Sequence, residues 1–260
     1  MKYDTIDIRK TKGITTVYLN RPDVHNAMNE KLIKELTSCF KEFYKDENIR
    51  IIILTGNGKS FCSGADLHWM KSIMKYSKEE NIKDSNLLLD LYETIYNCPK
   101  PVIGRINGST FGGGIGLIAV CDIVIAFTEC KFAFSEVKLG IIPAVISTYV
   151  VRRIGKSNMR RLFITGERFD SKYAKEIGLI DHVVAENDLN EIINQYIELI
   201  RFSGPNAIKE VKKLINAYEK LDLEKYKDFT VKKIAELRIS DEGQEGMNAF
   251  LEKRKAKWSE

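Results

Sequence analysis

The sequence lacks the residue patterns of metal sites and disulfide frameworks. Its 260 residues include only three histidines and five cysteines, with no Cys-x-x-Cys or His-x-x-x-His spacing. We therefore expect no metal, because zinc and iron–sulfur centres usually show such paired ligands. An odd number of scattered thiols indicates a reducing compartment.

Long apolar runs and blocks of one charge sign are also missing. The longest uncharged segment, residues 106–121, is too short and too rich in glycine to span a bilayer. Residues 1–7 contain no apolar signal region, so we predict a cytoplasmic protein without a membrane partner. The 41 Lys and Arg are interleaved with 36 Asp and Glu, which leaves a net charge of +5. Nucleic acid is not an expected partner, because nucleic-acid binders usually concentrate their basic residues.

Strand and helix patterns alternate in the first part of the chain. They predict a hairpin over residues 5–19, a helix from about Asn29 to Lys45, and buried strands at residues 51–54, 102–106 and 123–126. A further helix through residues 88–95 stops before Pro99. This order favours an α/β fold, and a chain with 44% hydrophobic residues can bury a sizeable core.

The end of the chain is predicted to be helical. Apolar residues recur at helical spacing from about Asp188, Pro205 suits the first turn of a helix, and Ser240 can cap another. We divide the chain into a core, residues 1–200, and a helical region, residues 201–260. Helices without a sheet to cover bury their apolar faces on the core or on another subunit, so this region is a candidate oligomerisation element.

Two loops with small residues could approach a ligand closely. Residues 60–67 follow a buried strand, and Asp66 can cap a following helix; the alternative is an ordinary strand-to-helix junction. Gly112, Gly113 and Gly114 open an apolar helix, where backbone N–H groups can hold a phosphate or a developing oxyanion. The alternative there is tight packing of helix on sheet. No Gly-Lys-Ser/Thr follows, which excludes a nucleotide phosphate loop.

Glu136 is a candidate proton carrier. It lies in segment 132–140, an otherwise strand-like stretch that ends before Pro143. A carboxyl group among apolar residues can exchange protons near neutrality, because burial raises its pKa. The alternative is a solvated strand residue.

Together, these motifs resemble the crotonase (enoyl-CoA hydratase/isomerase) family. The resemblance rests on Leu19-Asn20-Arg21-Pro22, residues 61–67, Asn107-Gly108 with the triple glycine, residues 121–123 and 135–140, and it extends to residues 249–254. It implies a core spiral of ββα units and a C-terminal helical region used for trimerisation, often in a dimer of trimers. It also implies an acyl-CoA thioester as substrate, with no cofactor apart from the coenzyme A of that substrate.

The resemblance assigns roles to individual residues. The N–H groups of Ala65 and Gly113 would form an oxyanion hole for an enolate-like thioester, with Glu136 as the catalytic acid and base. Lys253 would reach a CoA phosphate. The alternative is that Lys253 lies on the solvated face of its helix. The residues expected to contact substrate or CoA are His25, Ala27, Ser63, Ala65, Asp66, Leu67, His68, Gly113 and Lys253.

One position departs from the hydratases of the family, which usually carry two glutamates. One matches Glu136, but Gly116 stands at the other, two residues after the triple glycine. Three interpretations stay open. Glu136 alone could serve both proton transfers of a hydration, with water in the space beside Gly116. It could instead move a proton between the α- and γ-carbons, as in a Δ3-Δ2 enoyl-CoA isomerase, or the protein could bind acyl-CoA without turning it over.

A narrower resemblance favours hydration. Residues 64–70, 76–81, 135–147 and 149–152 resemble bacterial methylglutaconyl-CoA hydratases, in which a glycine at that position is common. The prediction is therefore a hydro-lyase, an enoyl-CoA hydratase for a branched substrate such as 3-methylglutaconyl-CoA in leucine breakdown. The distal carboxylate of this substrate would need a cation, with Lys71, Arg105, Lys138 and Arg152 as candidates; the alternative is that these are surface charges.

Overall fold

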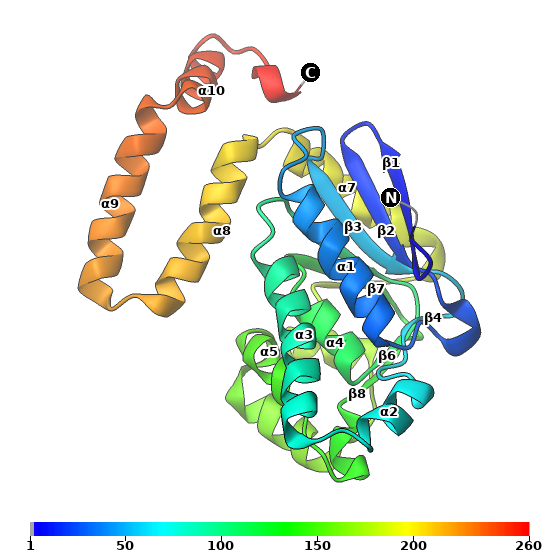
Figure 1. The fold of residues 1–260 in the computed structure, drawn as a ribbon. Coiled ribbons are helices and arrows are strands. Elements are labelled where there is room, and N and C mark those ends of the chain that lie inside the picture. Colours follow the sequence, from blue (N-terminus) through cyan, green and yellow to red (C-terminus); the bar gives the residue numbers. More distant parts are fainter. Residues whose placement is uncertain (1–2, 260) are drawn as a thin grey trace.

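The chain folds into two interleaved β-sheets covered by helices (Figure 1). The computed structural model describes residues 3–259, so Met1, Lys2 and Glu260, at the outer limits of the predicted domains, lie outside the described residues. In spatial order, the larger sheet consists of β1 (Ile6–Thr11), β2 (Ile14–Leu19), β3 (Ile51–Gly56), β5 (Val102–Ile106), β7 (Ile123–Phe127) and β10 (His182–Val184). The smaller sheet consists of β4 (Ser60–Cys62), β6 (Ser109–Phe111), β8 (Lys131–Ala133) and β9 (Phe169–Asp170).

Successive strands alternate between the two sheets and produce the expected spiral. β3 of the larger sheet is followed by β4 of the smaller one, β5 by β6, and β7 by β8. Neighbouring strands of this series pair in parallel within each sheet. The expected α/β spiral of ββα units is therefore confirmed.

Helices cover both faces of the larger sheet. The helices of the core are α1 (Glu30–Phe43), α2 (Leu67–Ile73), α3 (Lys78–Tyr96), α4 (Gly113–Ala119), α5 (Ala144–Thr165), α6 (Ser171–Glu176) and α7 (Leu189–Arg201). The main core lies among α1, α3, α4, α5 and one face of the sheet. On the other face, Ile53 and Ile125 pack against Ile193 of α7. Parallel strands buried on both faces need continuous apolar runs, which is the pattern of residues 51–54.

The elements with the strongest periodicity are confirmed. The predicted N-terminal hairpin is the antiparallel pair β1–β2. α1 begins after Asn29, whose Oδ1 accepts the N–H of Leu32 at 2.9 Å. The helix α8 (Pro205–Lys220) carries Pro205 in its first turn, and Ser240 Oγ accepts the N–H of Gly243 at 3.1 Å at the start of α10 (Asp241–Leu251).

The strand expected around Glu136 is wrong. β8 ends at Ala133, and Ser135–Leu139 form a short 3-10 helix, η2, which closes at Gly140 in the left-handed conformation. Phe132 and Phe134 are both fully buried, and their alternation suggests that the strand continues to residue 136. The chain instead leaves the sheet after Ala133, and this turn moves the carboxylate from a sheet face to a sheet edge.

The last three helices extend away from the core (Figure 1). α8 is followed by α9 (Leu223–Ile239) and α10, and the carboxylate of Glu242 in α10 accepts the N–H groups of Asn206 and Ala207 at the start of α8. Several large apolar side chains of these helices are exposed, among them Ile239 (81%) and Phe250 (82%). In the described part of the chain, no helix combines the length and the hydropathy needed to cross a membrane.

Candidate active site

Three neighbouring strand ends of the smaller sheet frame the candidate site. β4, β6 and β8 pair in parallel, so their carboxyl ends lie at one edge of the sheet. From these ends the chain continues into Gly64-Ala65, Gly112-Gly113 and η2 with Glu136. The topology therefore brings together three segments that are far apart in the sequence.

The first segment presents the N–H group of Ala65. Met28 donates its N–H to the Gly64 carbonyl at 2.7 Å and accepts the N–H of Asp66 at 2.8 Å, so Ala65 forms an isolated parallel bridge with Met28. In an extended chain, the peptide groups of successive residues point to opposite sides, so the N–H of Ala65 points away from Met28. Within residues 3–259 this N–H has no hydrogen-bond partner, and Ala65 is exposed.

The second segment presents the N–H group of Gly113. Gly112 has a φ of +50°, a conformation that glycine adopts readily, and donates its N–H to the Ala133 carbonyl at 3.0 Å. The N–H of Gly113 has no partner among the described residues. A Cβ on Gly64 would lie 3.1 Å from the Phe111 carbonyl oxygen, so the two backbone segments are in contact.

Glu136 lies against the second segment. A Cβ on Gly112 would lie 3.2 Å from Glu136 Oε1, which places the carboxylate directly beside the triple glycine. Glu136 Oε2 is buried and has no hydrogen-bond partner in the described part of the chain. Burial raises the pKa of Glu136 above its ordinary value. The raised pKa makes the carboxylate a stronger base toward a molecule that contacts the two free N–H groups.

An ion pair that the sequence analysis did not predict holds the first segment. Arg21 Nη2 lies 2.8 Å from Asp66 Oδ2, and the same guanidinium donates to the Ala27 carbonyl. Asp66 Oδ1 accepts the N–H groups of His68 and Trp69, which confirms Asp66 as the cap of α2. Burial would raise the pKa of Asp66, but the hydrogen bonds from Arg21 and the α2 backbone outweigh it and hold this pKa below its ordinary value. The carboxylate of Asp66 positions the loop, and its predicted contact with CoA stays a prediction.

Asn26 connects the turn after Arg21 to the segment that leads into β4. It is fully buried, its Oδ1 accepts the N–H of Arg21 at 2.8 Å, and its Nδ2 donates to the carbonyls of Asn57 and Ser60, both at 2.9 Å. Arg21 and Asn26 flank a turn that contains Pro22. The sequence signal for Arg21 was only its place in the motif Leu19-Asn20-Arg21-Pro22, and Asn26 was marked only by its place between His25 and Ala27. Both have partners in distant parts of the chain, which a local pattern does not reveal.

The structure brings most of the predicted contact residues together. Exposed His25 lies with Nδ1 3.0 Å from Ser60 Oγ, and its carbonyl accepts the N–H of Ser63 at 3.0 Å. Ala27 is buried next to the Met28 bridge, whereas Leu67 and His68 are exposed in the first turn of α2. These residues surround Ala65.

Lys253 does not join them within one chain. It follows α10 near the carboxyl terminus, where the Trp258 carbonyl accepts a hydrogen bond from Arg50 at 3.1 Å. Arg50 directly precedes β3, whereas the segment with Ala65 follows the opposite end of that strand. Figure 1 shows α10 and α2 at opposite ends of the molecule.

Side chains fill the space beside Gly116. A Cβ on Gly116 would lie 2.5 Å from Ile146 Cγ2 and 2.6 Å from Tyr92 Cζ, far inside ordinary contact distance. The interpretation that a water molecule occupies this space is therefore wrong. Tyr92, which lies in the helix predicted through residues 88–95, fills this space, and its hydroxyl donates to the Gly113 carbonyl at 2.7 Å.

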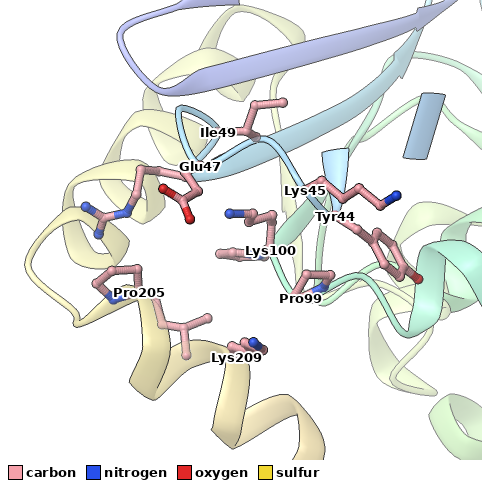
Figure 2. A pocket seen from close by; sticks show the side chains of 11 residues that line it. Tyr44, Lys45, Glu47, Ile49, Pro99, Lys100, Pro205 and Lys209 are labelled. Atoms are coloured by element: carbon pink, nitrogen blue, oxygen red, sulfur yellow. The ribbon is translucent and has the colours of Figure 1, made fainter. Parts of the chain in front are cut away.

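A pocket of about 260 Å³ lies elsewhere, between the end of α1 and the start of α8 (Figure 2). Its lining includes Tyr44, Pro99, Lys100, Pro205 and Lys209, and none of the predicted site residues. The candidate site is thus the edge formed by the three strand ends, and not this pocket.

Comparisons with known proteins show the family of this chain. The family model "Enoyl-CoA hydratase/isomerase" matches residues 9–260. The mitochondrial enoyl-CoA hydratase of Pongo abelii is 32% identical over 254 residues, which cover 96% of this chain and 85% of that protein. A crystal structure of an enoyl-CoA hydratase from Shewanella pealeana has a TM-score of 0.95 and 38% identity, over 99% of this chain and 97% of that one. Pseudomonas aeruginosa AtuE has a TM-score of 0.96 and 32% identity, over 99% and 100% of the two chains.

Fold and site define an α/β protein of the crotonase class, with a C-terminal helical region. The chain belongs to the enoyl-CoA hydratase/isomerase family. This family acts on acyl-CoA thioesters.

Proposed function

We propose that this protein is an enoyl-CoA hydratase that uses Glu136 as its single acid and base. The observation that carries the proposal is the position of a buried, unpartnered carboxylate oxygen beside the unpartnered N–H groups of Ala65 and Gly113. When the carbonyl of a 2-enoyl thioester lies between these two donors, the β-carbon of its double bond becomes electrophilic. Such donors stabilise the oxyanion of the transition state, each by about 3–4 kcal/mol.

The reaction needs one proton carrier. Glu136 takes a proton from water while the water oxygen bonds to the β-carbon and the π electrons move to the thioester oxygen. The enolate then collapses, and the α-carbon takes the proton from Glu136. All atoms of the water enter the product, and no cofactor is required beyond the CoA of the substrate. The named hydratases among the similar proteins support hydration.

One observation favours isomerisation as a second candidate. Tyr92 and Ile146 leave no room for a second carboxylate at position 116. Transfer of a proton from the α-carbon to the γ-carbon of a 3-enoyl-CoA needs only the carboxylate of Glu136 and the same oxyanion hole.

We further propose a branched substrate with a distal carboxylate, such as 3-methylglutaconyl-CoA. Of the four candidate cations for the distal carboxylate, two already have partners. Arg152 pairs with Glu219 at 3.0 Å, and Arg105 donates to Asn190 of α7 on the other face of the larger sheet. Lys71 and Lys138 have no ion pair within residues 3–259. Either is available for the distal carboxylate.

We propose that the protein is a homotrimer or a dimer of trimers. Support comes from the exposed apolar side chains of α8, α9 and α10, for which one chain offers no cover. Lys253 could then contact a CoA phosphate only in the site of another copy, because in its own chain it lies at the other end of the molecule.

The experiment is a turnover assay on crotonyl-, 3-enoyl- and 3-methylglutaconyl-CoA with the wild type, Glu136→Gln and Glu129→Gln. Glu129 is an exposed glutamate just before β8, so it controls for the loss of one negative charge. We expect hydration of 3-methylglutaconyl-CoA, a loss of about 10²- to 10⁴-fold in Glu136→Gln, and wild-type rates in Glu129→Gln. Acyl-CoA should raise the melting temperature of all three proteins.

Other outcomes decide among the alternatives. Conversion of 3-enoyl-CoA to 2-enoyl-CoA without hydration would establish the isomerase. Thermal stabilisation by acyl-CoA without any turnover would establish a binding protein. Equal rates on crotonyl- and 3-methylglutaconyl-CoA that Lys71→Met and Lys138→Met leave unchanged would refute the branched substrate alone.

A further inference from the structure

Tyr92 connects the two features that distinguish this site, the glycine at position 116 and the N–H of Gly113. It lies on α3, is fully buried, and fills with its ring the space that a side chain at position 116 would need. Its hydroxyl donates to the Gly113 carbonyl at 2.7 Å. Tyr92 thus makes a hydrogen bond from α3 to Gly113 at the start of α4, and Gly113 presents one of the two oxyanion donors.

Gly113 needs such a contact. It stands between two other glycines, and Gly112 has a positive φ, so the backbone here has more conformational freedom than three residues with side chains would have. A Cβ on Gly113 would lie 3.2 Å from Tyr92 Oη and 3.3 Å from Met28 Sδ. Met28 also bridges to Ala65. Met28 and Tyr92 therefore enclose Gly113 and connect both N–H donors to the core.

The hydroxyl of Tyr92 is a permanent donor. Burial, followed by the nearby Cys62 and Glu136, raises the pKa of Tyr92 well above its ordinary value, so the phenol stays protonated wherever the enzyme works. Its one proton is engaged by the Gly113 carbonyl. It therefore acts on the backbone and does not transfer a proton to substrate.

We propose that Tyr92 is a positioning residue, which fixes the N–H of Gly113 in the oxyanion hole through its hydrogen bond to the Gly113 carbonyl. The inference rests on the proposed function, because it concerns the polarisation of an acyl-CoA carbonyl. The carbonyl and the N–H of Gly113 belong to successive peptide groups joined at its Cα, so loss of the Tyr92 hydroxyl frees φ and ψ of Gly113 and lets the N–H turn away from the oxyanion. This weakens a hydrogen bond that matters most in the transition state. The turnover number and kcat/KM then fall together while KM stays near its wild-type value.

The test compares Tyr92→Phe with Tyr149→Phe. Tyr149 belongs to the same aromatic cluster, with its ring centroid 6.0 Å from that of Tyr92, and its hydroxyl makes no hydrogen bond in the described part of the chain. Kinetics are measured on the substrate that the wild type turns over. The infrared stretch of the thioester carbonyl of bound butyryl-CoA, which has no double bond to hydrate, reports polarisation without turnover.

We expect Tyr92→Phe to lower kcat by about 10- to 100-fold, with KM unchanged and the carbonyl stretch moved toward its value in water. Tyr149→Phe should leave all three quantities at wild-type values. Replacement of Tyr92 by 4-aminophenylalanine restores a donor and should recover part of the rate and of the carbonyl shift. If Tyr92→Phe does not fold, the 4-aminophenylalanine variant provides the test. In that variant we expect kcat to fall by a few-fold, together with a smaller shift of the carbonyl stretch than in the wild type.

Several results would overturn the inference. If Tyr92→Phe keeps the kcat and the carbonyl stretch of the wild type, the hydrogen bond is not used. The same holds for the 4-aminophenylalanine variant if Tyr92→Phe does not fold. Equal losses in Tyr92→Phe and Tyr149→Phe show a general effect of packing. A wild type that turns over none of the three thioesters refutes the proposed function, whereas the butyryl-CoA stretch still tests the role of Tyr92.

Discussion

Replacement of Gly116 by alanine tests the packing that separates this site from a site with two carboxylates. The added Cβ would lie 2.5 Å from Ile146 Cγ2 and 2.6 and 2.8 Å from two carbons of the Tyr92 ring. Ordinary carbon contacts are about 3.5–4.0 Å, so the neighbours must move by about 1 Å. Both neighbours are buried, with Tyr92 at 0% and Ile146 at 2% exposure, so they cannot move into solvent.

Two effects of opposite sign set the magnitude. Overpacking of a core costs about 1–3 kcal/mol, and more where backbone must shift. Alanine is favoured over glycine inside a helix by about 1 kcal/mol. Because the contacts are so short, overpacking outweighs helix propensity, and we expect Gly116→Ala to lose about 1–2 kcal/mol of unfolding free energy.

Urea unfolding measures this loss as a lower midpoint with an unchanged slope. Gly246→Ala is the matched control: it is also a helical glycine, but its Cβ would meet only the far edge of the Trp258 ring, at 3.0 Å. The control should be as stable as the wild type or more so. If Gly116→Ala were instead more stable than the wild type, helix propensity would outweigh overpacking, and the space beside Gly116 would not be filled. By the same reasoning, Gly116→Glu should unfold the protein and not restore a second catalytic carboxylate.

Three further predictions concern charge and association. Because burial raises the pKa of Glu136, the folded state favours its protonated form, and the contribution of this group to stability is lost as pH rises through the folded pKa. Glu136→Gln should therefore be more stable than the wild type at about pH 8 and should lose this advantage at about pH 4. Urea unfolding at each pH measures the difference. Arg21→Met leaves the carboxylate of Asp66 buried and unpaired, and should cost about 3 kcal/mol near pH 7. Since the pKa of Asp66 is held low, the difference between Arg21→Met and the wild type should shrink as pH falls through the folded pKa of Asp66, and a difference independent of pH would contradict the role of the ion pair. Ile239→Glu with Phe250→Glu places charges on the exposed apolar surface and should reduce the assembly to single chains in sedimentation velocity, with the circular dichroism spectrum preserved; an unchanged sedimentation coefficient would mean that this surface is not the interface.

The sequence by itself determined the local elements and the chemistry that they carry. The apolar repeat from Leu32 to Phe43 defines one face of α1, and the continuous apolar run that forms β3 marks a strand buried on both faces. The same kind of evidence placed the caps Asp66 and Ser240. These features depend on residues close together in the chain, so period and propensity are sufficient to find them.

Only the tertiary structure decided which residues meet. Arg21 and Asp66 are 45 positions apart, and Tyr92 reaches Gly113 from a different helix, so neither contact leaves a periodic signal in the sequence. The strand pattern around Glu136 was misleading for the same reason, because β8 ends where its partner β6 ends, at the pair of Ala133 and Phe111. Local alternation does not show where the partner strand ends. Gly116 shows both sides: the sequence reveals that a glutamate is missing there, and the fold reveals that Tyr92 and Ile146 occupy its place.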